Sequence, residues 1–189
     1  CDSDEEFVDS DYVSQELVII AYISKDPVWM EAIANGWDLH SIAAELVYKS
    51  KWKAAAESSC EYYKSKQKCS CKRHKVMRTG CKSINFGLAY GMTEMKLAGE
   101  LGITVKEAMA LIKEYFSAFP SIKATLEFLG NFGLQNGYIM TLAPFFRKRW
   151  FPYWSQWRNY IEPHMMGVKY VPTLGEIERA SKNAPIQGS

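Results

Sequence analysis

Two cations and two aromatic rings recur four residues apart in the stretch RTGCKSINFGLAYG, residues 78–91. On an α-helix, positions four apart advance about 40° beyond a full turn, so these side chains line one edge about 18 Å long. That length is roughly the reach of a nucleoside triphosphate, because cations hold phosphates and rings pack on a sugar and a base. Aromatic residues at helical spacing also occur in ordinary cores. The four positions are Arg78, Lys82, Phe86 and Tyr90, and Gly91 follows them.

Carboxylates gather at the other end of the chain. Asp11 and Glu16 stand five residues apart in DYVSQEL, a spacing that would put them on opposite faces of one strand. We therefore expect Asp11 to end a strand and Glu16 to lie on the following turn or helix. Mg²⁺ prefers one or two carboxylates plus substrate oxygens, and it clamps the reacting oxygens in phosphoryl transfer. Asp11 is the candidate ligand, Asp9 is the second choice, and a solvated carboxylate is the ordinary alternative.

The charges are segregated, although the net charge is only +2. Residues 1–24 hold seven acids and no Lys or Arg, whereas residues 62–93 hold eight Lys or Arg and no acid. Residues 128–161 also lack acids and include several arginines. Any one such run is typical of a solvated face, but the combination suits a cation and a polyanion bound side by side.

The 189 residues, 48% apolar and 23% charged, are typical of one globular domain. Helical patterns predominate, and strand patterns occur only near residues 6–12 and in GYIMTLAPFFRKRWFPYW, which predicts a hairpin. The fold class is therefore mixed α/β of the α+β kind. We find neither an apolar run of about 18 residues nor a signal peptide, so we expect a cytoplasmic location and no membrane partner. The chain lacks an initial Met and stops within a predicted helix, so we expect a fragment of a longer protein.

Start and stop signals predict several helix boundaries. SQELVIIAYIS, residues 14–24, is expected to form the helix after the strand, and another helix ends at Asn35-Gly36 before a restart. A helix spans about 76–90, and Thr104 with Glu107 has capping-box spacing ahead of the next one. Pro120 begins a further helix that ends at Asn136-Gly137, and a last helix covers TLGEIERASKNAPIQG.

RTGCKSINFGLAYGM closely resembles motif B, the fingers O-helix of family A DNA polymerases. The resemblance implies that Arg78 and Lys82 bind the phosphates of the incoming dNTP, and that Lys82 also protonates the departing pyrophosphate. It further implies that Phe86 packs on the deoxyribose and base. Tyr90 would stack near the templating position, and Gly91 would contact DNA.

DYVSQEL resembles motif A of the same family. The resemblance implies that Asp11 and the Tyr12 carbonyl bind Mg²⁺, and that Glu16 crowds the sugar 2′ position. Ser14 and Gln15 fall one place late and Val18 replaces the usual Arg, so Ser14 and Gln15 stay unassigned. DLHSIAAELV is similar to an Asp-hydrophobic-His segment, which implies that His40 touches the triphosphate; a structural histidine is the ordinary alternative.

ERASKNAPIQGS resembles the family motif that contacts the primer terminus and the template. It implies that Arg179, Asn183 and Gln187 bind DNA from one helix edge, which Pro185 must distort. GYIMTLAPFFRKRWFP is similar to a segment whose basic residues contact DNA, and it offers Arg147 or Arg149. Contact with phosphate by either would be independent of sequence and sensitive to salt.

The resemblance runs from about residue 7 to the end, apart from residues 49–77, with four motifs in family order. It implies a palm part at 1–24, helical fingers at 25–140 with an insert at 49–77 and the O-helix at 76–91, and a return to the palm at 141–189. The implied partners are primer-template DNA and dNTP. Two Mg²⁺ ions are implied, but the second catalytic Asp would lie outside this chain, leaving the fragment inactive alone. The insert and the shifted motif A hint at a phage-like branch, and so at a nucleoid or a phage-infected cell.

Two other functions stay open. A non-catalytic nucleic-acid-binding module would need neither Asp11 nor the ladder of residues 78–90. A single-subunit RNA polymerase has a related fingers helix, but Glu16 together with Phe86 favours deoxyribonucleotides. Other triphosphate-binding classes are disfavoured, because the chain has neither a Gly-x-x-x-x-Gly-Lys-Ser/Thr loop nor Gly-x-Gly-x-x-Gly.

The insert contains a possible zinc site in CSCKRH and a nearby cysteine. Thiolates and imidazole suit Zn²⁺, and four ligands complete a tetrahedron. Cys-x-Cys is tighter than the usual spacing, and the first cysteine is nine residues away, so the sequence favours a basic exposed loop with reduced thiols. The candidate ligands are Cys60, Cys69, Cys71 and His74.

Overall fold

The chain is mainly helical. A computed structural model describes residues 14–89, 91–142, 146–152, 154 and 172–188. Within them, β1 (Tyr138–Met140) pairs antiparallel with β2 (Lys148–Trp150). The α+β class with few strands and many helices is therefore confirmed. The helices are α1 (Gln15–Ser24), α2 (Pro27–Ala34), α3 (Leu39–Tyr48), α4 (Ser50–Ala54), α5 (Tyr62–Ser65), α6 (Lys72–Ala89), α7 (Glu94–Leu101), α8 (Val105–Ala118), α9 (Pro120–Asn136) and α11 (Leu174–Gln187).

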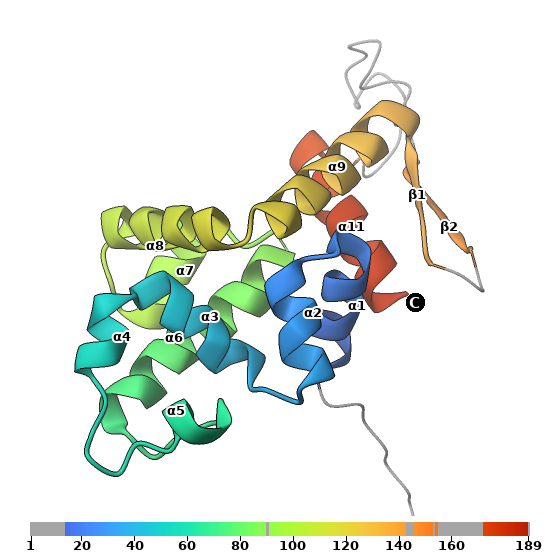
Figure 1. Cartoon of the computed structure of the whole chain (residues 1–189). Coiled ribbons are helices and arrows are strands. Elements are labelled where there is room, and N and C mark those ends of the chain that lie inside the picture. Colours follow the sequence, from blue (N-terminus) through green and yellow to red (C-terminus); the bar gives the residue numbers. More distant parts are fainter. Residues whose placement is uncertain (1–13, 90, 143–145, 153, 155–171, 189) are drawn as a thin grey trace, which may run out of the picture.

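The helices pack around α6 and along α9. Figure 1 shows α8 and α9 following one another across the molecule, with α3 and α6 below α8. Helix α11 lies against α9, and the β1–β2 hairpin extends from the end of α9 (Figure 1). The last helix thus returns to the first one, because α11 also contacts α1.

Most of the predicted helix boundaries are confirmed, and each has a local cause. The Thr104 side chain accepts a hydrogen bond from the Glu107 backbone N–H, while the Glu107 carboxylate accepts one from the Thr104 backbone N–H. Pro120 is the first residue of α9, where its missing N–H costs nothing. Gly137 ends α9 in the left-handed conformation at φ 73°.

The sequence-based boundaries are wrong in the 49–77 segment. The helix expected from about residue 76 begins at Lys72, and the segment expected to be an inserted loop or a small subdomain contains α4 and α5. Lysine and arginine are good helix formers, so the basic run 72–75 extends α6. No apolar stripe in this run predicts the extension. Side chains of this segment also enter the interior, since Trp52 and Tyr62 are fully buried.

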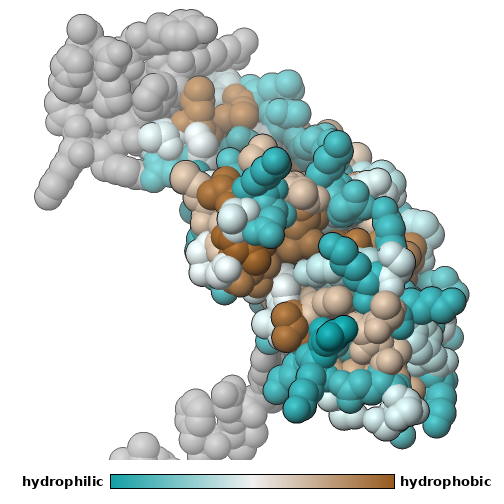
Figure 2. Space-filling view, turned by 90° about the vertical axis from the view of Figure 1, so that its left-hand side faces the viewer, coloured by the Kyte–Doolittle hydropathy of each residue, from teal (hydrophilic) through white to brown (hydrophobic). Residues whose placement is uncertain are grey.

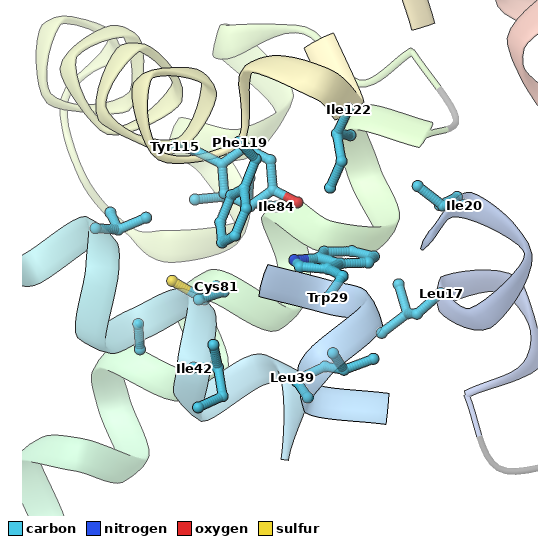
Figure 3. Close-up of a cluster of buried hydrophobic side chains, with 14 of the residues drawn as sticks. Leu17, Ile20, Trp29, Leu39, Ile42, Cys81, Ile84, Tyr115, Phe119 and Ile122 are labelled. Atoms are coloured by element: carbon cyan, nitrogen blue, oxygen red, sulfur yellow. The ribbon is translucent and has the colours of Figure 1, made fainter. Parts of the chain in front are cut away.

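One hydrophobic core fixes the face of α6 that points inward. Trp29 meets Phe119 edge to face at 5.9 Å between ring centroids, and Cys81 and Ile84 of α6 are fully buried beside them (Figure 3). A second cluster joins α9, α11 and the hairpin through residues such as Ile139 and Ile177. Burying Cys81 and Ile84 turns the opposite edge of α6 toward the surface.

The surface of the described part is mixed. In Figure 2 the most hydrophobic residues gather in the middle of the face, and hydrophilic residues cover much of its lower part. Among the described helices, none combines the length and the apolar character needed to cross a membrane.

Candidate functional site

The cationic and aromatic positions lie on one edge of α6, as their spacing predicts. Arg78, Lys82 and Phe86 all fall within the helix, and the eight steps from Arg78 to Phe86 span about 12 Å. Lys82 is exposed, and it makes no ion pair with any described residue. The Tyr90 position lies outside the described residues. The edge therefore offers one accessible ammonium between a guanidinium and a ring.

Arg78 is held by a carboxylate that sequence reasoning did not assign. Its Nε and Nη2 donate to the two Asp38 oxygens at 2.7 and 2.8 Å. Asp38 also caps α3 by accepting from the Ser41 backbone N–H at 2.9 Å. Burial raises the pKa of the Asp38 carboxyl, but hydrogen bonds from Arg78 and Ser41 and the charge of Arg78 outweigh it and lower that pKa below its usual value. Arg78 is thus fixed in direction, with Nη1 left over for another acceptor.

His40 is packed against the same edge. The Asn85 amide donates to His40 Nδ1 at 2.9 Å, and the His40 and Phe86 rings lie 5.6 Å apart. An imidazole that accepts at Nδ1 carries its proton on Nε2. Burial lowers the pKa of His40 to about 4, the Asp38 charge opposes this, and the charges of Arg78 and Lys82 add to it. His40 is therefore neutral at pH 7 and presents one N–H donor.

A cavity of about 590 Å³ opens beside the helix edge. Lys82 and Phe86 line it from α6, Lys96 from α7 and Arg179 from α11. Its volume falls in the range of small-molecule sites, about 300–1,000 Å³. Three of these four residues are basic, with one acid, Glu100, in the lining, so the cavity favours an anion that also carries an apolar part.

Gly91 lets α11 reach this cavity. Its φ of 68° lies in the left-handed region that glycine adopts without strain. A Cβ at this position would clash with Cγ of Arg179. The absence of a side chain at Gly91 therefore brings the Arg179 stem against the end of the α6 segment.

The predicted magnesium ligands Asp9, Asp11 and Tyr12 lie outside the described residues. Ser14, three residues after Asp11, lines a hollow of about 290 Å³ together with Asp38 and His40. Glu16 lies in the first turn of α1, which agrees with the expectation that it stands on a turn or helix.

The predicted DNA contacts form two groups. Helix α11 continues through Pro185, which is buried near the C-terminal end, where one missing N–H leaves most of the helix intact. On this helix, the Asn183 Oδ1 atom is buried without a hydrogen-bond partner in the described part of the chain, and Gln187 is exposed. In the hairpin, Arg147 Nη2 donates to the Gly188 carbonyl at 2.6 Å, and Arg149 is exposed on β2.

The cysteine and histidine candidates do come together. The ligand atoms of Cys60, Cys69, Cys71 and His74 all lie within 4.8 Å of one another. Cys71 and His74 are buried, with exposed fractions of 0% and 1%. The segment is therefore not the simple exposed loop that the sequence favours. The sequence pattern named all four residues. The separation of Cys60 from the other three along the chain gave no indication that they lie close together.

The comparisons concern the whole chain. The model of the family described as DNA polymerase family A matches residues 1–189. The chain is 32% identical to DNA polymerase I of Borreliella burgdorferi, over 97% of this chain and 17% of that protein, and 32% identical to DNA polymerase I of Bacillus subtilis, over 95% and 17%. The POL domain of Pol1 from M. smegmatis, in complex with DNA primer-template and dNTP, is similar with a TM-score of 0.66 and 27% identity, over 95% of this chain and 26% of that one. The chain thus spans about 17% of the length of these two curated relatives.

Proposed function

This chain belongs to the family A DNA polymerases, and from that membership we propose that it supplies part of the nucleotide site of an enzyme for template-directed DNA synthesis. In that reaction a primer 3′-hydroxyl attacks the α-phosphate of a dNTP, and pyrophosphate leaves. The observation that carries the proposal is the α6 edge, where Lys82 and Phe86 line one cavity of about 590 Å³. A cation and a ring in one cavity match the two ends of a nucleotide.

The triphosphate lies at the cationic end of this edge. Lys82 is exposed and directed to the cavity, where its ammonium neutralises phosphate oxygens and donates a proton to the departing pyrophosphate. Arg78 uses Nε and Nη2 on Asp38, so it can offer Nη1 to a phosphate without leaving that carboxylate. The Asp38 contact positions the guanidinium and reduces the freedom it would lose on binding.

His40, which lines the Ser14 hollow and packs on Phe86, would provide a neutral donor at the same edge of α6. Its Nδ1 accepts from Asn85, which leaves Nε2–H to donate to a phosphate oxygen. A neutral histidine can donate a hydrogen bond to phosphate without adding a positive charge to the site. The low pKa of His40, about 4, keeps it neutral at pH 7.

The base and sugar lie toward the aromatic end. Phe86 is half-buried beside His40 and lines the cavity, so its ring can pack on a sugar or a base there. Tyr90 would extend this surface toward the template. Glu16 would exclude a 2′-hydroxyl, so deoxyribonucleotides are the preferred substrates.

Asp11 and the Tyr12 carbonyl would hold Mg²⁺, because carboxylate and carbonyl oxygens are the hard ligands that this ion favours. Such an ion neutralises charge on the reacting oxygens. Ser14, the first described residue after this segment, lines a hollow with Asp38 and His40, and Asp38 holds Arg78, which supports a metal site near the cationic end of α6. The second ligand would come from outside this chain, which on its own would be inactive.

The DNA lies across α11 and the hairpin. Arg179 reaches the cavity and the end of the α6 segment, and Asn183 follows it by four residues on the same helix edge. Gln187 continues this edge, while Arg147 and Arg149 meet phosphates. In this division residues 1–24 and 141–189 belong to the palm and residues 25–140 to the fingers. The M. smegmatis domain, solved with primer-template and dNTP, supports these partners.

Nucleotide affinity tests the proposal. We expect the chain to bind a dNTP with Mg²⁺, and Lys82→Ala to weaken binding by about 10- to 100-fold, the equivalent of about 1.5–3 kcal/mol for a charged hydrogen bond. Lys106→Ala removes an equal charge from an exposed position of α8 and should leave the affinity unchanged. Calorimetric titration measures both. Equal affinities for the two variants would contradict the proposed site, and binding of DNA without any dNTP affinity would favour the non-catalytic module.

A further inference from the structure

A group of four side chains in the 49–77 segment has no part in the proposed nucleotide site. Cys60 precedes α5, Cys69 and Cys71 follow it, and His74 lies in the first turn of α6. Their Sγ and imidazole nitrogen atoms all lie within 4.8 Å of one another. Three thiols and one imidazole from separate stretches of chain thus meet at one point. We propose that Cys60, Cys69, Cys71 and His74 bind one structural zinc ion, which fastens this segment to the start of α6.

The orientation of His74 is the one that a metal requires. Its Nε2 lies 2.8 Å from the Trp52 carbonyl oxygen, which can only accept, so the Nε2 atom carries the proton. The unprotonated Nδ1 then faces the sulfurs, at 3.6 Å from Cys60 Sγ and 3.1 Å from Cys69 Sγ. A histidine ligand that donates its other N–H to a backbone carbonyl is the usual outer arrangement of zinc sites. The Trp52 ring stacks on the imidazole at 3.8 Å and fixes its plane.

The size of the cluster suits one ion. Zn–S bonds of about 2.3 Å and Zn–N bonds of about 2.0–2.1 Å give tetrahedral edges of about 3.6–3.8 Å between ligand atoms. The Cys60–His74 distance of 3.6 Å already has this value. The Cys69–His74 distance of 3.1 Å is that of a hydrogen bond and would lengthen slightly. The widest separation, 4.8 Å, closes by about 1 Å, which is within the reach of side-chain rotation.

The donor set selects zinc among the common metals. Soft thiolates with an imidazole in a four-coordinate site favour Zn²⁺, whereas Mg²⁺ and Ca²⁺ require oxygen ligands. Four protein ligands leave no open position, which is typical of a structural site. The described cysteines are all free thiols, so no disulfide competes for these sulfurs.

The surroundings also compensate the charge. Three thiolates and one Zn²⁺ carry a net charge of −1. Cys71 lies directly before the first residue of α6, where the Lys75 N–H donates to its carbonyl, so its thiolate is at the positive end of the helix dipole. Exposed cations follow at Lys72 and Arg73.

The consequence concerns the end of α6 that precedes the nucleotide residues. Zinc would hold the turn before α5 and the turn after it against the first turn of α6, around the buried Trp52 and Tyr62. Arg78 follows His74 by one helical turn. The ion would therefore set the direction in which α6 leaves the segment, without touching the nucleotide.

Metal content tests the proposal on the reduced 189-residue chain. After dialysis against a weak chelator, we expect one zinc per chain by plasma mass spectrometry and by native mass spectrometry. Cys69→Ser should reduce this to well below one. The matched control is Cys81→Ser, which changes a buried cysteine outside the cluster and should keep one zinc. No retained zinc, or the same zinc content in Cys69→Ser, would overturn the proposal.

A cobalt titration keeps the test valid where a variant folds poorly. Co²⁺ added to the metal-free wild-type chain should give thiolate charge-transfer bands and the intense visible bands of tetrahedral cobalt, with saturation at one equivalent. His74→Ala should keep thiolate bands but bind Co²⁺ more weakly and with shifted visible bands, because water replaces the imidazole nitrogen, provided that circular dichroism shows the wild-type helix content. Weak octahedral bands in the wild-type chain, or bands that do not saturate, would refute a built site.

Discussion

Replacing His40 by Gln tests the buried donor beside the proposed triphosphate site. Glutamine can accept the Asn85 hydrogen bond that His40 Nδ1 now accepts, but it does not titrate. Burial, opposed by Asp38 and aided by Arg78 and Lys82, lowers the pKa of His40 from 6.5 to about 4. In the unfolded chain this histidine keeps its ordinary pKa of about 6.5.

The sign and size of the effect follow from these two pKa values. Between pH 6.5 and 4 the unfolded chain binds more protons at His40 than the folded chain, so acid favours unfolding. The histidine contributes its full stability above pH 6.5 and loses it as the pH falls toward 4. Between pH 7.5 and 5 the wild-type chain should lose about 2 kcal/mol of its free energy of unfolding through His40. This value is RT times the logarithm of the ratio of the term 1 + 10^(pKa − pH) for the unfolded chain to the same term for the folded chain.

Urea unfolding at pH 7.5 and pH 5 measures the effect. Other groups titrate in both proteins, so the informative quantity is the stability difference between the wild type and His40→Gln. This difference should shift by about 2 kcal/mol in favour of the variant at pH 5. A shift below about 0.5 kcal/mol, comparable with the extrapolation error, would refute the buried neutral histidine.

Two further predictions concern contacts around the same edge. Asp38→Asn keeps a capping side chain for α3 but removes the ion pair with Arg78. We expect the free energy of unfolding, measured with denaturant, to fall by about 1–3 kcal/mol. A fall below about 0.5 kcal/mol would show that the ion pair contributes little to stability. Gly91→Ala should cost about 1 kcal/mol for the left-handed backbone plus the displacement of Arg179. Gly36→Ala has a similar φ with nothing within 4 Å and should cost the backbone part alone, so equal losses in the two variants would argue against the Arg179 contact.

Local signals made much of the fold predictable. The capping box at Thr104, the proline that begins α9 and the Asn136-Gly137 end act within a few residues, and each appears in the structure. The start of α6 was not predicted in this way. The basic residues before position 76 favour a helix, but the contact that holds its first turn, His74 against Trp52, joins residues 22 apart.

In the candidate site, too, the local features were predictable and the long-range contacts were not. The four-residue spacing of Arg78, Lys82 and Phe86 was sufficient to predict one helix edge, because helix geometry alone sets it. The partners of that edge were not predictable. Asp38 meets Arg78 across 40 residues of chain and Asn85 meets His40 across 45, and both contacts exist only because α3 packs on α6.

The most direct test of the central claim is photolabelling with a dNTP that carries a photoreactive group on its base, in the presence of Mg²⁺. The label should enter the peptide that contains Phe86 and Gly91, which line the cavity, and unmodified dNTP should prevent it. Ribonucleotides should compete less well. Labelling confined to peptides outside the α6 segment, or labelling that excess dNTP does not reduce, would contradict a nucleotide site on this helix edge.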